Sequence, residues 1–184
     1  MSGICFEVNP LSRQRLMEIT TLLRTILQID RPFFPILEVV EFAFPRIFAD
    51  FCFTVREMNE MGGNHGLTLF RPNEIRLRID VYDGVEQRKG RDRMTLAHEV
   101  GHLLLHDAPG LARKPKNSVD IPPYKSSEWQ ANAFAGSLLM PIEFLKSARS
   151  LREIIDECAV TEEAAATHTR LLTQAGLLCN PCLG

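Results

Sequence analysis

The sequence predicts an α+β fold in which a small antiparallel sheet of about three strands packs on several helices. Three observations lead to this prediction. Apolar residues recur at helical spacing in the first and last thirds of the chain, whereas apolar and polar residues alternate in short segments between residues 51 and 79. Glycine, proline and asparagine separate these segments. With 184 residues, of which 45% are hydrophobic, the chain is long enough for one domain with its own core.

The N-terminal region is predicted to form two helices, one strand and a hairpin. Asn9-Pro10 is a good start for a helix that continues to residue 27. A second helix covers residues 35–42 and ends at Pro45. Residues 51–55 alternate as in a strand, and residues 67–70 and 75–79 read as a hairpin around a turn at 71–73. In its second strand we expect Ile75, Leu77 and Ile79 to face inward and Arg76, Arg78 and Asp80 to face outward.

Two long helices follow the hairpin. The first is expected to be capped by Asp92 and to end before residues 107–110, which read as a stop signal. The second starts near Ser126 or Ser127 and ends at Pro141. The loop at residues 107–125 either flanks a functional cleft or is an ordinary solvated loop with incidental cations, which are Arg113, Lys114 and Lys116.

The first of these helices carries the motif His98-Glu99-Val100-Gly101-His102. Histidines four residues apart lie on one helical face, one turn apart, so their imidazoles can bind the same metal ion. The carboxylate of Glu99 lies beside that ion, where it can take a proton from water. The pattern is typical of a catalytic zinc site, although two histidines and a carboxylate also accept other divalent metals.

The second helix supplies candidates for a third ligand and its support. Glu128, Ala131, Asn132, Ala135 and Gly136 form one stripe, polar at its start and small-sided after it. Small side chains allow close packing against the histidine helix, so a carboxylate at residue 128 can complete the metal site. Asn132, one turn on, can orient a ligand through a hydrogen bond. The alternative is that Glu128 is only a first-turn acid favoured by the helix dipole.

These two helices resemble the ImmA/IrrE family of zinc metallopeptidases. Residues 94–106 read M-T-L-A-H-E-V-G-H-L-L-L-H, where the family shows T-L-A-H-E-x-G-H-x-L-L-H. Residues 128–135 and 138–141 read E-W-Q-A-N-A-F-A and L-L-M-P, where the family shows E-x-x-A-N-x-F-A followed by L-L-M-P. The resemblance covers about residues 66–176, and the usual Phe before Thr95 is Met94 here.

The resemblance implies a zincin-like, gluzincin type of fold, with one Zn²⁺ held by His98, His102 and Glu128 and with Glu99 as the base. It also implies a substrate, because family members cleave helix-turn-helix repressors of phage, mobile-element or stress-response genes. We therefore expect a single metallopeptidase domain over residues 1–184. Its parts are N-terminal helices and a first strand (1–65), a catalytic core (66–141) and a helical C-terminal subdomain resembling a helix-turn-helix (142–184).

The reaction also needs a donor that stabilises the tetrahedral oxyanion, and the sequence does not single one out. The candidates, in falling order, are Tyr124, Tyr82 and His65. His106 continues the four-residue spacing, but it lies a further turn along the helix, so we expect it to support the site or the fold rather than to bind the same ion.

An alternative function is a non-proteolytic, metal-containing regulatory module that binds a repressor or DNA. Residues 151–171 resemble a helix-turn-helix, and residues 151–176 together have a net charge of −3, from two arginines and five acidic residues. Contacts with phosphates need the opposite sign, and the whole chain is at −2. We expect no direct contact with nucleic acid.

The sequence predicts a cytoplasmic protein. The first residues lack a basic start and a long apolar run, and no segment is long enough to span a membrane. The chain has five cysteines, and the three scattered ones, Cys5, Cys52 and Cys158, fit buried free thiols in a reducing compartment. The pair Cys179 and Cys182 forms a lone C-x-x-C, which is weak evidence for redox or metal chemistry.

Overall fold

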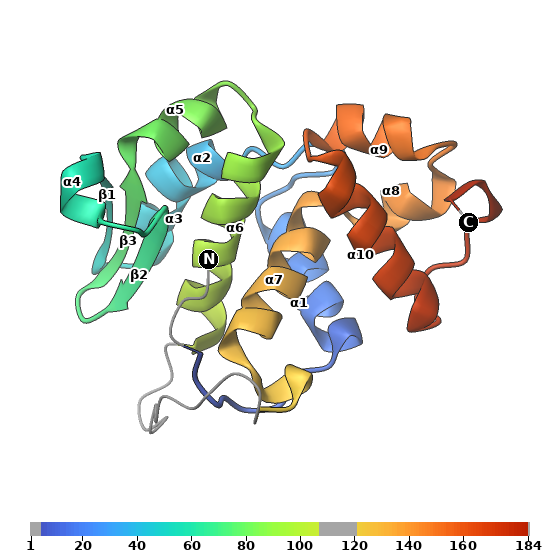
Figure 1. The fold of residues 1–184 in the computed structure, drawn as a ribbon, viewed down its shortest axis with the longest axis horizontal. Coiled ribbons are helices and arrows are strands. Elements are labelled where there is room, and N and C mark those ends of the chain that lie inside the picture. The colour runs from blue at the N-terminus through green and yellow to red at the C-terminus, as the bar shows by residue number, and fades with distance from the viewer. Residues whose placement is uncertain (1–4, 107–120, 184) are drawn as a thin grey trace.

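The computed structural model describes residues 5–106 and 121–183. In Figure 1 a small sheet lies at one end of the molecule and a group of helices at the other. The helices at the far end are α8 (Ile142–Ser147), α9 (Leu151–Cys158) and α10 (Glu162–Gln174). Those that run between the sheet and this group are α1 (Arg13–Ile26), α6 (Gly90–His106) and α7 (Ser127–Leu139). The predicted α+β class is confirmed; the division into segments 1–65, 66–141 and 142–184 stays a prediction.

The sheet has three strands but is mixed rather than antiparallel. The strands are β1 (Phe51–Arg56), β2 (Gly66–Phe70) and β3 (Asn73–Arg78), in the order β1-β3-β2. The predicted hairpin of β2 and β3 is confirmed, with Phe70 opposite Asn73. The expectation of an antiparallel sheet is wrong for β1, which runs parallel to β3. The short helix α4 (Met58–Met61) leads from β1 to β2, which lies at the opposite edge of the sheet. The chain then reverses at the hairpin, so β3 lies between the two and runs in the same direction as β1.

The inward face of β3 is only partly as predicted. Ile75 and Leu77 are fully buried, but Ile79 begins the helix α5 (Ile79–Glu86) instead of ending the strand. Arg78, expected to face outward, is also buried. Its guanidinium donates to Asp80 Oδ1 at 2.6 Å and contacts His65 Nδ1 at 2.9 Å, so the charge is paired where the strand turns into the helix.

The N-terminal helices differ from the prediction at their ends. Ser12, and not Asn9, caps α1, because its side chain accepts a hydrogen bond from the backbone N–H of Arg15. The expected stop at Pro45 is wrong as well. Pro45 stands at the start of α3 (Phe44–Ile47), directly after a π-helical turn in which Phe44 N–H donates to the carbonyl of Val39, and it does not end the helix. This helix continues a helical run through α2 (Ile36–Glu38) and a π-helical turn, Val39–Ala43.

Residues 5–11 run alongside the chain that leads into α7. Glu7 forms a bridge with Ser126, Val8 N–H donates to the carbonyl of Lys125 at 2.8 Å, and Ser127 N–H donates to the carbonyl of Phe6 at 3.0 Å. A short 3-10 turn, Pro123–Lys125, lies between this contact and the helix. The N-terminal segment therefore holds the start of α7 in place.

The predicted α6 and α7 are confirmed, and they pack closely. Ser126 caps α7 through the backbone N–H of Trp129, as expected. Asp92 does not cap α6, which already starts at Gly90. A Cβ atom added to Gly101 would lie 3.1 Å from the Cα of Ala131, so only glycine allows this approach without a shift of the helices. The expected loop between α6 and α7 falls largely outside the described residues.

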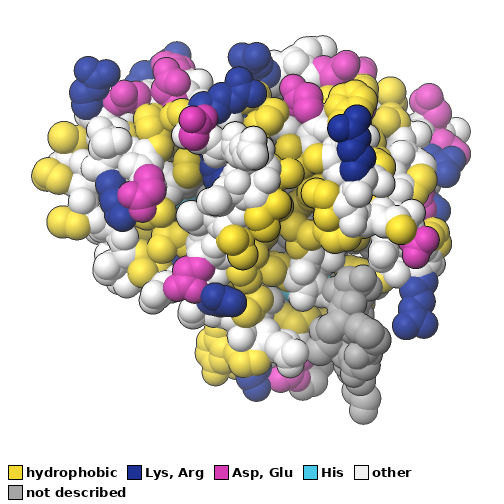
Figure 2. Space-filling view, turned by 180° about the vertical axis from the view of Figure 1, so that it is seen from behind, with side chains coloured by type: hydrophobic (Ala, Val, Ile, Leu, Met, Phe, Trp, Pro, Cys, Tyr) yellow, Lys and Arg dark blue, Asp and Glu magenta, His cyan; other side chains and the backbone are white. Residues whose placement is uncertain are grey.

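The C-terminal helices pack on α7 through a buried histidine. A Cβ added to Gly136 would lie 2.6 Å from Nδ1 of His168 in α10. The expected burial of free thiols is confirmed for Cys5 and Cys158 but is wrong for Cys52, which is exposed, as are Cys179 and Cys182. Within the described ranges, no helix combines the length and apolar character needed to cross a membrane. Figure 2 shows the opposite face of the molecule, where hydrophobic side chains gather in the middle and side chains of both charges mix along the upper edge.

The burial of His168 predicts a pH-dependent contribution to stability. Burial, and then the charge of Arg13, lowers the pKa of His168 to about 3 from the ordinary 6.5. Between about pH 3 and pH 6.5 the unfolded chain binds a proton at residue 168 and the folded chain does not. The contribution of His168 to the free energy of unfolding is therefore complete above about pH 6.5 and is lost as the pH falls. Below that pH, wild type is expected to lose up to about 1.4 kcal/mol per pH unit more than His168→Leu. Urea unfolding of both proteins along a pH series measures this difference, and parallel losses would contradict it.

Candidate metal centre

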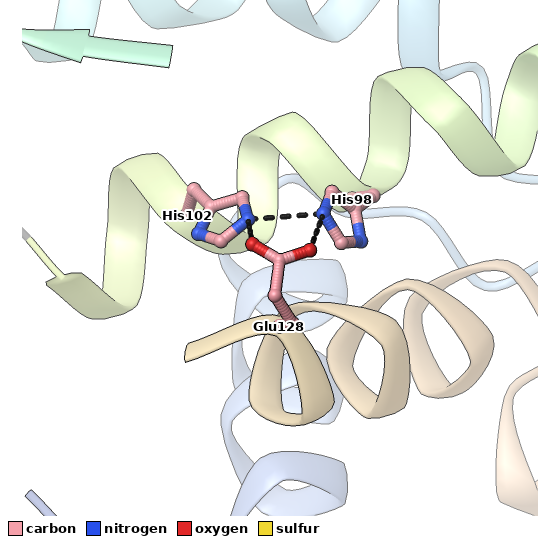
Figure 3. A group of neighbouring side chains, drawn as sticks. All are labelled: His98, His102 and Glu128. Carbon is pink, nitrogen blue, oxygen red and sulfur yellow. Dashed lines mark hydrogen bonds and ion pairs between the residues drawn. The ribbon is translucent and has the colours of Figure 1, made fainter. Parts of the chain in front are cut away.

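The structure brings His98, His102 and Glu128 together, each with one ligand atom turned toward the others (Figure 3). The Nε2 atoms of His98 and His102 are 2.9 Å apart. Nε2 of His102 lies 3.2 Å from Oε1 of Glu128, and Nε2 of His98 lies 3.5 Å from Oε2. All three ligand atoms lie within 4.8 Å of one another. Two imidazole nitrogens and one carboxylate are the donor set of a catalytic zinc site with an open position, so these residues fit a divalent metal.

The local sequence explains this convergence. The histidines are one turn apart on α6, as their spacing predicts. Glu128 lies in the first turn of α7, and the contact between Gly101 and Ala131 brings that turn against the histidine face. The cap at Ser126 fixes where α7 begins and so places the carboxylate.

The electrostatics of the cluster shift the pKa values of Glu128 and His98 in opposite directions. Burial acts to raise the pKa of Glu128, but the contacts of its carboxylate with His102 and His98 outweigh burial and hold that pKa well below its usual range. Burial acts to lower the pKa of His98, but Glu128, the charge of Glu99 and Asn132 together raise it. Since a metal binds only unprotonated imidazole, the raised pKa of His98 makes metal binding compete with protons as the pH falls.

Glu99 lies beside the cluster and is held there by the sheet. Its side chain is 8% exposed. The hydroxyl of Thr68 in β2 lies 2.7 Å from Oε2 of Glu99, to which it donates, and 3.0 Å from the backbone oxygen of the same residue. Sequence reasoning missed this role of Thr68. The available signal was a hydroxyl at an inward position of an alternating strand.

Gly66, at the start of β2, leaves the space that the Glu99 side chain fills. A Cβ at Gly66 would lie 2.7 Å from Cγ and 3.0 Å from Oε1 of Glu99. Because the carboxylate is enclosed and held by Thr68, Gly66→Ala is expected to displace it and to lower turnover about 10²-fold, with zinc binding unchanged. Gly63→Ala is the control, since a Cβ there meets nothing within 4 Å. Equal turnover of the two variants would show that Glu99 does not need this position.

Asn132 and His106 contact the two histidines from behind. Oδ1 of Asn132 lies 3.0 Å from Nδ1 of His98, which is the orienting contact expected from the sequence. Nδ1 of His106 lies 3.0 Å from Nδ1 of His102. Each histidine of the cluster therefore has a partner on its Nδ1 atom and turns its Nε2 atom toward Glu128.

The side chains of the three candidate oxyanion donors make their contacts away from the group His98, His102 and Glu128. Tyr124 is 48% exposed in the 3-10 turn before α7. The hydroxyl of Tyr82 in α5 donates to Oε1 of Glu41, and burial followed by that carboxylate raises its pKa to about 12. His65 bonds Arg78. Among the described residues, no hydrogen bond joins any of the three side chains to His98, His102 or Glu128.

The part of the chain that contains this site matches a known peptidase family. Residues 81–170 match the model of peptidase family M78, described as an IrrE N-terminal-like domain. The matched range includes α6, α7 and every residue of the cluster. No curated protein matches the chain significantly.

Proposed function

Because residues 81–170 belong to peptidase family M78, the IrrE N-terminal-like domains, we propose that this protein is a zinc-dependent endopeptidase that cleaves a helix-turn-helix transcriptional repressor. The observation that carries the proposal is the group His98, His102 and Glu128 with the carboxylate of Glu99 near enough for its charge to raise the pKa of His98. Cleavage of the repressor would release the genes that it controls, which the resemblance to ImmA/IrrE peptidases implies are phage, mobile-element or stress-response genes.

In this mechanism His98, His102 and Glu128 hold the ion. When bound, zinc supplies Lewis acidity, which polarises the scissile carbonyl and makes water more acidic. Glu99 takes the proton from the attacking water and later passes it to the nitrogen of the leaving amine. The C–N bond then breaks, and the products are a new carboxyl terminus and a new amino terminus. Thr68 and the space at Gly66 keep the Glu99 carboxylate at the place where it takes that proton.

The sheet offers a way to hold an extended substrate next to this site. β2 stands at an edge of the described sheet, and its Thr68 reaches Glu99. An extended peptide that adds to β2 as a further strand would lie beside α6, with main-chain hydrogen bonds giving affinity. A repressor segment therefore has to be unfolded or extended to be cut.

The charge of the C-terminal helices favours a protein substrate over DNA. α9 and α10 lie in the segment with a net charge of −3. In addition, α10 turns His168 and Leu172 into the core rather than toward a partner. Both observations support packing, and neither supports phosphate contacts.

A reporter controlled by a helix-turn-helix repressor encoded beside this gene tests the proposal. Co-expression of wild type is expected to raise reporter output while the full-length repressor is replaced by shorter fragments on an immunoblot. If reporter output rises while the repressor stays intact, the protein acts by sequestration. If neither changes with a zinc-loaded protein, that repressor is not its substrate.

A further inference from the structure

We propose that Gln130 and His106 act as a positioning pair that fixes the tautomer of His102, so that its Nε2 atom carries the lone pair for the metal. This inference rests on the proposed zinc site, and it gives a positioning role to two residues that do not themselves bind the metal. Both side chains are almost fully buried, at 1% and 2% exposure, so water does not compete for their hydrogen bonds.

The orientation of the Gln130 amide follows from its partners. Its Nε2 atom lies 2.8 Å from the backbone oxygen of Asn9 and 2.8 Å from that of Tyr124. Carbonyl oxygens only accept, so the NH2 group must point to them, and a flipped amide would place oxygen against two oxygens. The Oε1 atom of Gln130 therefore faces Nε2 of His106, at 3.2 Å.

This orientation sets the protons on both rings. Because Oε1 of Gln130 only accepts, Nε2 of His106 donates to it. An uncharged imidazole has a single N–H, so Nδ1 of His106 carries a lone pair and accepts from Nδ1 of His102, 3.0 Å away. The N–H of His102 then lies on Nδ1. Its Nε2 atom, which faces Glu128 at 3.2 Å and Nε2 of His98 at 2.9 Å, keeps a free lone pair.

Figure 3 shows this division, with one ring nitrogen of His102 turned to Glu128 and the other turned away from it. Metal binding requires a lone pair on Nε2 of His102. The donors and acceptors assigned from Gln130 onward place a lone pair on the same atom, without reference to the metal. Every bond along this chain of hydrogen bonds has one donor and one acceptor. The anchor at Asn9 also links the site to the N-terminal segment that docks against the start of α7.

The test compares His106→Leu with His106→Asn in the full-length protein. Leucine fills the space but gives Nδ1–H of His102 no acceptor, whereas Oδ1 of asparagine stands close to where Nδ1 of histidine stood. Competition with a chromophoric chelator is expected to show zinc affinity about 10–100-fold weaker for His106→Leu. His106→Asn should recover most of that loss.

His168→Leu is the matched control, because it removes another deeply buried histidine, 5% exposed, in α10. Its zinc affinity is expected to equal that of wild type. Nitrogen-15 NMR of the metal-free proteins in mildly alkaline buffer reads the tautomer directly. Wild type should show the N–H of His102 on Nδ1, and His106→Leu should lose this preference.

The outcomes separate the two proposals. A wild type that binds no zinc contradicts the proposed function, and the NMR result still decides the tautomer. A wild type that binds zinc, together with a His106→Leu protein of equal affinity, overturns the positioning role. The same conclusion follows if His106→Asn binds zinc as weakly as His106→Leu, because the lost acceptor would then not be the cause.

Discussion

Replacing Glu99 by glutamine is expected to leave a protein that folds and binds zinc but cleaves its repressor about 10²–10⁴-fold more slowly. The amide has the shape of the carboxylate and can still accept from Thr68, which donates at 2.7 Å in wild type. It cannot take a proton from water, and that step is the one assigned to Glu99. Zinc content by mass spectrometry and single-turnover cleavage of the purified repressor measure the two halves of this prediction.

The Glu99→Gln protein also separates proteolysis from sequestration. A protein that acts by binding a repressor does not need the base, so the variant would relieve repression as well as wild type. Loss of zinc from Glu99→Gln would instead mean that Glu99 is part of the ligand set. Either result would require a different account of the site.

Replacing Glu128 by glutamine is expected to weaken zinc binding by at least about 10–100-fold, the range seen when only the support of a ligand is lost. The change removes the negative charge that faces both histidines at 3.2 and 3.5 Å. His98→Ala, which removes a ligand outright, is expected to retain no stoichiometric zinc. Chelator competition on the intact proteins gives the affinities.

Glu162→Gln is the matched control for Glu128. Both glutamates lie in the first turn of a helix, at the positive end of its dipole. If Glu128 were only a favourable first-turn acid, the two variants would lose a similar few tenths to about 1 kcal/mol of stability and keep wild-type zinc affinity. A normal zinc affinity of Glu128→Gln would remove the third ligand from this account.

Patterns local in the sequence account for the positions of the helical residues in the candidate site. The four-residue spacing of His98 and His102, the cap at Ser126 and the stripe of small residues in α7 all depend on neighbours within a few positions. These features place Glu128 and Asn132 as expected, because a helix fixes which side chains share a face. The hairpin of β2 and β3 was also predictable, from its alternation and its turn.

Contacts between distant segments were not predictable in the same way. The parallel pairing of β1 with β3 depends on where the hairpin docks, and alternation carries no direction. The roles of Thr68 and Gly66 depend on the distance from β2 to α6. The orientation of the Gln130 amide likewise depends on the backbone oxygen of Asn9, 121 positions away in the sequence. Residue spacing within one helix does not predict such a contact.

We propose that the group of His98, His102 and Glu128, with Glu99 beside it, hydrolyses a peptide bond in a repressor. Intact-mass analysis of the purified repressor after incubation with zinc-loaded wild type tests this most directly. We expect two fragments whose masses sum to that of the repressor plus one water, and no fragments after chelation of the metal. A repressor that remains intact while bound to the zinc-loaded protein would contradict it.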